Sequence, residues 1–375
     1  MEKVGAYIHV PFCRKKCYYC DFCAFPNLEG WIDGYFENLK KEIKLYGEKM
    51  CLEIDSIYIG GGTPTYVNPK YIKEVVNEIY KNFKVDKDIE FTIEANPNSI
   101  NKDKLEIYKD LGINRISLGV QSFDDEILKK IGRDHTRDRV LKDINLIRKS
   151  GFDNLSIDLI VNLPGQDKNK IMTDLNFVKK ISPEHLSWYS LIIEQGSRFY
   201  TLDKKGLLNI FDEDLERDVF EQLVKELETI GLNRYEISNF AKKGYQSFHN
   251  KKYWDGDGYV SFGLSGSGFL SNYRYNNVRN FIKYERLLKE GKFPIESFEN
   301  IDINEREKEY IIFKLRETSG INLKVFKNKF GHDFLEKYKK VIDEFYKLGY
   351  FTIDDSIKFT PKGMDLSNEF YIEII

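Results

Sequence analysis

Residues 4–22, VGAYIHVPFCRKKCYYCDF, decide the fold. Six of the first seven, all but His9, are apolar or β-branched, and they predict a buried strand. Pro11 and Phe12 follow, and three cysteines then fall in a short polar loop at positions 13, 17 and 20. A reactive loop directly after a first strand indicates a site at the carboxyl end of a parallel sheet, where barrels build their sites.

Strand-like segments recur along the next 170 residues. They are IDSIYI at 54–59, IEFTIEA at 89–95, RISLGV at 115–120, LSIDLI at 155–160 and HLSWYSLI at 185–192. The intervening stretches, such as 34–47 and 70–83, carry apolar residues at helical spacing. Strands that alternate with helices predict a parallel sheet with right-handed crossovers. Six such units predict an α/β fold, a partial (β/α)6 TIM-like barrel, whose missing units leave a lateral opening for a bulky substrate.

The pattern changes after residue 200, and we expect three parts. Residues 1–235 would form the partial barrel, which ends with a long helix near 212–231. Residues 236–300, rich in aromatic residues and glycine, would be a connecting segment that contains HNKKYW at 249–254. Residues 301–375 read as helices followed by a hairpin, which predicts a small, mainly helical C-terminal domain with a winged-helix-like layout.

The composition is that of an ordinary globular chain. At 375 residues with 41% apolar content, it can form one large domain and one or two smaller ones. The chain has 58 Lys and Arg and 60 Asp and Glu. This balance gives no overall basic charge of the kind that would indicate nucleic acid or an anionic membrane as a partner. No run of ~18 apolar residues occurs, and the start shows no leader pattern, so we expect a cytoplasmic chain without an integral membrane segment.

The cysteine pattern indicates metal chemistry and argues against disulfides. Four of the five cysteines lie within residues 13–23, while Cys51 stands alone and reads as an inert small hydrophobe. A zinc site would need a second pair of ligands, and none with suitable spacing follows. Three thiolates from Cys13, Cys17 and Cys20 on a four-iron, four-sulfur cluster leave one iron free to bind a small molecule.

Polar residues follow the later strands at the same edge of the predicted barrel. Strand two runs into GGGTP at 60–64, whose backbone groups can approach a ligand closely. Strand three ends at Glu94, strand four at Gln121, strand five carries Asp158, and Arg133 lies beyond strand four. Each residue taken singly could equally cap a loop or line the barrel. Their joint placement favours a ligand site with a carboxylate for an ammonium group and an arginine for a carboxylate.

These motifs resemble a known family over nearly the whole chain. The Cys-x3-Cys-x2-Cys spacing is similar to that of radical S-adenosylmethionine (SAM) proteins, which implies a 4Fe-4S cluster whose open iron binds SAM. IHVPFCRKKCYYCDF, IGGGTPT, EANP, RISLGVQSF, LPGQ, HLSWYSL and HNKKYW together resemble the haem chaperone, or HemW-like, branch of the oxygen-independent coproporphyrinogen III oxidase-like proteins. The resemblance implies that Tyr19 lies beside the cluster. It also implies that SAM is contacted by Tyr7, Gly61, Gly62, Thr63, Glu94, Gln121, Arg133 and Asp158.

The branch of the family decides the expected activity. The oxidase carries a longer N-terminal extension and a further Cys two residues after the third, whereas here twelve residues precede Cys13 and position 22 is Phe22. The HNxxYW motif, present as His249, Asn250, Tyr253 and Trp254, is implicated in that family in binding haem for transfer to acceptor proteins. A histidine can supply an axial iron ligand, and aromatic rings can pack on a porphyrin.

Several alternatives stay open from the sequence. The chain could be a haem-trafficking protein, a radical enzyme that decarboxylates a porphyrin, or a scaffold whose C-terminal module recruits a partner, so enzymatic activity is undecided. Expected partners are haem or porphyrin, a haem-acceptor protein and an electron donor to the cluster. Cys23 reads either as a spare cluster ligand or as a residue that lines the loop. Ser267 stands where the family more often has histidine.

Overall fold

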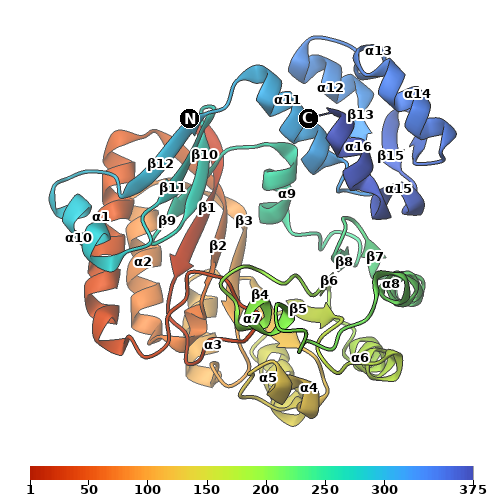
Figure 1. Ribbon diagram of the computed structural model, residues 1–375. Helices are drawn as coiled ribbons and strands as arrows, with labels where there is room; N and C mark the ends of the chain where they lie inside the picture. The colour runs from red at the N-terminus through yellow and green to blue at the C-terminus, as the bar shows by residue number, and fades with distance from the viewer. Residues whose placement is uncertain (375) are drawn as a thin grey trace.

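The computed structural model describes residues 1–374, apart from the side chain of Glu213, and has a curved sheet flanked by helices (Figure 1). Six consecutive parallel strands form its centre and confirm the predicted partial barrel. They are β1 (Glu2–Val10), β2 (Leu52–Gly61), β3 (Lys84–Ala95), β4 (Arg115–Gln121), β5 (Asn154–Val161) and β6 (His185–Ser190).

Helices connect these strands along the outside of the sheet (Figure 1). They are α1 (Ile32–Lys49), α2 (Pro69–Asn82), α3 (Lys102–Asp110), α4 (Asp125–Lys130), α5 (Arg137–Lys149) and α6 (Lys168–Ile181). After β6 come α7 (Arg198–Asp203), which lies at the barrel mouth against the cysteine loop, and α8 (Glu213–Glu228). Capping residues explain several of the helix starts. The side chains of Asn68, Asn101 and Thr136 each accept a backbone N–H in the first turn of α2, α3 and α5.

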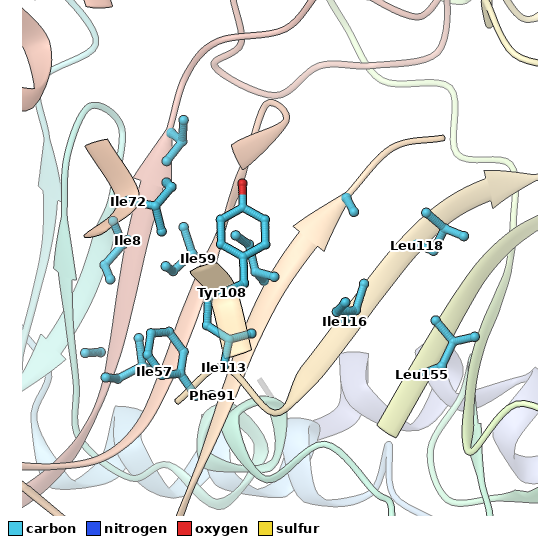
Figure 2. Close-up of a cluster of buried hydrophobic side chains, with 14 of the residues drawn as sticks. Ile8, Ile57, Ile59, Ile72, Phe91, Tyr108, Ile113, Ile116, Leu118 and Leu155 are labelled. Carbon is cyan, nitrogen blue, oxygen red and sulfur yellow. The ribbon is translucent and has the colours of Figure 1, made fainter. Parts of the chain in front are cut away.

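Strand alternation divides the barrel into an apolar outside and a polar inside. Ile57 and Ile59 of β2 lie in the same buried apolar cluster as Phe91 of β3 and Ile116 of β4 (Figure 2). The residues between them point to the opposite face, because successive side chains of a strand alternate. Tyr58, Thr92, Glu94, Ser117 and Asp158 therefore face the interior of the curve, where a ligand could be held.

Residues 236–300 extend the same sheet, which differs from the prediction of a connecting segment. Beyond β1 lie β9 (Tyr259–Phe262), parallel to β1, and the antiparallel strands β10 (Ser267–Leu270), β11 (Tyr273–Asn277) and β12 (Ile295–Asn300). Beyond β6 lie β8 (Asn239–Ala241) and β7 (Asn233–Arg234). Helices α9 (Phe248–Asp255) and α10 (Phe281–Lys289) separate these strands. The added strands are short and interrupted by glycine and serine, so they lack the alternation that marks β1–β6.

Glu42 of α1 joins this extension to the barrel. Its buried carboxylate accepts hydrogen bonds from Gly263 N (2.7 Å), Asn277 Nδ2 (2.7 Å) and the Tyr284 hydroxyl (2.5 Å). The donors come from the β9–β10 connection, from β11 and from α10. Burial raises the pKa of Glu42 to about 7, since the three donors offset only part of the desolvation.

The C-terminal part has an apolar core of its own, built around residues such as Ile311, Phe326 and Phe370. Its elements are α11 (Ile303–Lys314), β13 (Ile321–Asn322), α12 (Leu323–Phe330), α13 (Phe334–Lys337), α14 (Lys339–Lys347), β14 (Phe351–Ile353), β15 (Ser356–Phe359), α15 (Pro361–Asp365) and α16 (Ser367–Ile374). Helices followed by a β14–β15 hairpin match the predicted layout. Helix α11 packs beside α9, as Figure 1 shows for the blue part of the chain.

No helix within residues 1–374 is both long and apolar enough to cross a membrane.

Candidate cofactor site

The cysteine loop is held over the carboxyl ends of β1 and β2 by backbone hydrogen bonds. Its base is closed where Phe25 N donates to Pro11 O (2.8 Å) and Cys13 N donates to Phe25 O (3.3 Å). Thr63 N, just after β2, donates to Phe12 O at 2.8 Å. At the far side of the loop, Tyr18 N donates to the Ile131 carbonyl at 3.1 Å. The loop is therefore anchored to two neighbouring parts of the barrel mouth.

One cavity of about 310 Å³ beneath this loop collects most of the predicted site residues. It is bounded by the carboxyl ends of β2–β6 on one side and by the cysteine loop on the other. The predicted residues that line it are Cys13, Cys17, Tyr19, Cys20, Gly61, Gly62, Thr63, Glu94, Gln121, Arg133 and Asp158. Tyr7 and His249 do not line it.

Two glycines allow the close approaches on which this cavity depends. A Cβ atom on Gly62 would lie 2.7 Å from the Phe12 carbonyl oxygen, so only glycine lets β2 lie against the residue that precedes Cys13. A Cβ atom on Gly119 would lie 2.8 Å from Asn96 Oδ1 and 3.0 Å from Arg133 Nη2. Gly62 thus lets two backbone segments meet, and Gly119 lets polar side chains pack over bare backbone.

Glu94 is a half-buried carboxylate held in a fixed orientation. Oε1 accepts a hydrogen bond from the Tyr58 hydroxyl at 2.8 Å, and Oε2 accepts one from Gly61 N at 3.0 Å. Burial raises the pKa of Glu94 to about 7, and Asp158 adds to the shift by charge repulsion. A cationic ligand group beside Glu94 would favour its ionised form, which makes this carboxylate suited to an ammonium.

Gln121 and Arg133 present unpartnered polar atoms within the cavity wall. Gln121 has a φ of 69°, a left-handed conformation that is strained for a residue with a side chain. Its Oε1 atom and the Nε atom of Arg133 are buried without a hydrogen-bond partner. Arg133 Nη1 donates to Asn96 Oδ1 at 2.7 Å, which holds the guanidinium in place. Buried polar atoms normally find partners, so these two indicate a ligand.

Asp158 lies deeper, among residues that the sequence reading missed. Its carboxylate oxygens each lie 3.1 Å from Ser117 Oγ, which donates to them, and burial raises its pKa. Arg115 and Tyr58 also line the cavity, and so does Asn250, which the sequence analysis named only as part of the HNxxYW motif. The inward register of β4 could have identified Ser117 and Arg115, since both alternate with the apolar residues of that strand.

The three cysteines line one cavity, as the ligands of a single iron–sulfur cluster would. Within residues 1–374, no three His, Cys, Asp or Glu side chains converge closely enough to hold one ion. Thiolates that bind three different irons lie farther apart than ligands of one ion. Burial raises the pKa of Cys13 to about 12 and also raises that of Cys20, so both need nearby positive charge to ionise. Iron would supply that charge.

Cys23 does not share a cavity with the other three cysteines of the loop. It lines a second cavity, with Ser265 and Arg279, and does not line the cavity of Cys13, Cys17 and Cys20. Burial raises the pKa of the Cys23 thiol, while Arg279 and a hydrogen bond with Ser265 act in the opposite direction. This placement favours the second of the two sequence readings, in which Cys23 lines the loop.

Tyr7 and His249 lie behind the walls of the cofactor cavity. The Tyr7 ring stacks on Tyr58 with ring centroids 6.1 Å apart, and its hydroxyl lies 3.1 Å from His9 Nδ1. His249 is 1% exposed, and both ring nitrogens have partners, Ser56 Oγ at 2.9 Å and the Tyr253 hydroxyl at 2.8 Å. One of these hydrogen bonds would have to break, and the buried ring would have to become accessible, before His249 could ligate iron, so this geometry does not support the predicted axial role.

The barrel, its cysteine loop and the cavity between them define a radical SAM protein. The family model of the radical SAM superfamily matches residues 7–178, and that of the HemN C-terminal domain matches residues 301–366. The solved structure of coproporphyrinogen III oxidase (HemN) from Escherichia coli, a radical SAM enzyme, is similar with a TM-score of 0.87. The match covers 100% of this chain and 90% of that one at 21% identity, which shows a shared fold.

Similar proteins of known name identify the family of this chain within the radical SAM proteins. Heme chaperone HemW of Bacillus subtilis is 35% identical over 370 residues, 98% of each chain. HemW of Escherichia coli is 31% identical over 322 residues, 84% of this chain and 83% of that protein. The chain belongs to the HemW family of radical SAM proteins. Membership of the radical SAM superfamily implies a 4Fe-4S cluster and SAM.

Proposed function

We propose that this chain binds a 4Fe-4S cluster and SAM in the barrel cavity, and that it binds haem and delivers it to an acceptor protein. The binding of the cluster and SAM is supported by one observation. Cys13, Cys17 and Cys20 line the same cavity as the polar residues at the carboxyl ends of β2–β5. The binding and delivery of haem are supported by the whole-length similarity to proteins named heme chaperones.

We assign residues of the chain to the cluster and to the different groups of SAM according to their charge and polarity. We assign Cys13, Cys17 and Cys20 to the cluster and Tyr19 to its edge. Glu94 would hold the methionyl ammonium of SAM, and Arg133 its carboxylate. Gln121 and Asp158 would take the ribose hydroxyls, while Gly61, Gly62 and Thr63 supply backbone contacts. When bound, the cluster supplies an iron without a protein ligand and a source of single electrons.

Tyr7 and His249, which the family resemblance implies as ligand-binding residues, take indirect roles in this proposal. Tyr7 supports the cavity wall because it stacks on Tyr58, which in turn donates a hydrogen bond to Glu94. His249 holds Tyr253 in place. An electron donor to the cluster and a haem acceptor complete the set of partners. All five cysteines are free thiols, which favours the reducing environment of the cytoplasm.

The cofactor assignment is tested by anaerobic reconstitution of the full chain. Cys20→Ser is expected to lose most of its iron and sulfide, whereas Cys51→Ser, at an exposed position, is expected to retain wild-type amounts. Equal iron in both variants would contradict the assignment. SAM binding is then measured by calorimetry on the loaded wild-type protein.

One further assay distinguishes a protein that delivers haem from an enzyme that converts a porphyrinogen. Loaded protein is mixed with haem or with coproporphyrinogen III, in the presence and absence of SAM. The proposal predicts stoichiometric haem binding, transfer to an apo-haem protein, and no conversion of the porphyrinogen. Formation of 5'-deoxyadenosine coupled to porphyrinogen turnover would instead establish an oxidase.

A further inference from the structure

A second cavity, of about 380 Å³, opens beside the cofactor cavity on the β1–β9 side of the barrel mouth. Phe22 lines both cavities and is 63% exposed, so an apolar side chain stands between them. Tyr253 and Tyr259 form part of the wall, with ring centroids 4.6 Å apart and planes nearly perpendicular. The cavity therefore offers aromatic surface next to the cluster loop.

Three polar groups face this aromatic wall: the Cys23 thiol, the Ser265 hydroxyl and the Arg279 guanidinium. Ser265 has a φ of 58°, a strained value for serine, and its backbone N–H donates to Val278 O at 3.0 Å. The connection between β9 and β10 is thereby held so that Ser265 reaches Cys23. Arg279 directly follows Val278, so the same backbone contact brings its charge to the cavity.

The main chain at Cys23 is fixed from the barrel side. His9 Nε2 lies 2.8 Å from the Cys23 carbonyl oxygen, and His9 Nδ1 lies 3.1 Å from the Tyr7 hydroxyl. Burial lowers the pKa of His9 to about 4, so the ring is neutral and its Nε2 donates to the carbonyl. Asp21 is the acidic residue of this cavity.

We propose that this second cavity is the haem site, with the Cys23 sulfur as the axial iron ligand and Arg279 as the partner of a haem propionate. The proposal rests on the proposed haem-binding function and assigns it a place in the chain. Cysteine thiolate is an established type of axial ligand to haem iron, and arginine is suited to carboxylates. Tyr253, from the HNxxYW motif, would contact the porphyrin, which gives that motif a role without His249 on the iron.

Ligation involves no change of oxidation state. The S–H bond of Cys23 breaks, its proton passes to solvent, and a bond forms between the sulfur and ferric haem iron in place of a weak ligand such as water. The cofactor cavity stays free for SAM, because Cys23 lies outside it.

The test uses the cluster-loaded full chain and ferric haem under anaerobic conditions, with Cys23→Ser and, as a matched thiol control, Cys51→Ser. Wild type and Cys51→Ser are expected to bind one haem and, after reduction and addition of CO, to show the strongly red-shifted Soret band of thiolate-ligated haem. Cys23→Ser is expected to lose that band and to bind haem at least ~10-fold more weakly, while it retains wild-type iron and sulfide.

Each other outcome overturns the inference in a distinguishable way. A wild-type spectrum typical of histidine or tyrosine ligation, or an unchanged spectrum and affinity in Cys23→Ser, would refute Cys23 as ligand and leave haem binding intact. Loss of cluster iron in Cys23→Ser would make Cys23 a cluster ligand. A wild type that binds no haem would overturn both this inference and the proposed function.

The role of Arg279 is tested with haem and its dimethyl ester, which lacks the propionate charges. Wild type should bind haem at least several-fold more tightly than the ester, and Arg279→Gln should bind the two equally. An Arg279→Gln variant that discriminates as wild type does would exclude this arginine as the propionate partner.

Discussion

Ser56 Oγ lies 2.9 Å from His249 Nδ1 and joins β2 to α9 across 193 residues of sequence. The other ring nitrogen of His249 is bonded to the Tyr253 hydroxyl. His249 therefore fastens α9 to β2, and the first expected consequence is for the stability of the fold.

We expect His249→Ala to lower the free energy of unfolding by about 2–4 kcal/mol, because a buried ring is removed and two hydroxyls lose their partner. Phe248→Ala, at the neighbouring position where the ring is 47% exposed, is the control and should change stability far less. Urea denaturation of both variants measures the difference. Similar losses in the two variants would contradict the structural role of His249.

His249 should also make stability depend on pH. Burial lowers its pKa to about 3, against an ordinary value of 6.5, so the unfolded chain binds a proton that the folded chain does not. The stability from neutral His249 is present above pH 6.5 and is lost as pH falls toward 3. Relative to wild type, His249→Phe should therefore show a slope shallower by up to about 1.4 kcal/mol per pH unit in this window. Parallel slopes would refute the prediction.

Glu94→Gln should weaken SAM binding to the cluster-loaded protein by about 10- to 100-fold, because the ammonium loses a charged partner. In wild type, affinity should fall as pH drops below about 7, where Glu94 becomes protonated in the free protein. The variant should lack this fall. Calorimetry between pH 6 and 8 tests both points, with exposed Glu106→Gln as control. An unchanged affinity for Glu94→Gln would remove Glu94 from the site.

Gly62→Ala should disturb the cluster loop, because the new methyl group would meet the Phe12 backbone. We expect a loss of about 1–3 kcal/mol in stability and a clear drop in reconstituted iron. Gly34→Ala, in α1 with open space at its Cβ position, is the matched control. It should leave iron content unchanged and increase stability by a few tenths to ~1 kcal/mol. Normal iron content in Gly62→Ala would argue against the close approach.

Glu42→Gln should destabilise the chain most at low pH. The amide would set its NH₂ group against donors that now point at a carboxylate. With a folded pKa of about 7 against an ordinary value of 4.5, wild-type Glu42 contributes stability below pH 4.5 that is lost as pH rises through 7. The difference in free energy of unfolding between wild type and the variant should therefore shrink by on the order of 3 kcal/mol as pH rises from 4.5 to 7.

The matched control for this position is Glu37→Gln, an exposed residue of the same helix, which should be neutral at every pH. Urea denaturation at several pH values gives both series. A deficit of Glu42→Gln that grows as pH rises would reverse the assigned sign.

The barrel, and the grouping of polar residues at its mouth, could be predicted from the amino-acid sequence alone. Six apolar strands that alternate with helical segments specify a parallel sheet, because the two periodicities are local properties of the chain. Parallel strands bring their carboxyl ends to one edge. Residues such as Glu94, Gln121 and Asp158 could therefore be grouped with the cysteine loop before any contact was known, and the cavity contains all of them.

Only the tertiary structure decided what residues 236–300 do. Their strands are short, and pairing of β9 with β1 is a contact between segments some 250 residues apart, which no local period encodes. That pairing brings Ser265 and Arg279 to the cavity that Cys23 lines, while His249, on α9, is buried against Ser56 of β2. The orientation of a cysteine in a loop, or of a histidine on a short helix, depends on which distant backbone lies beside it, so it follows from the assembled sheet and not from the motif.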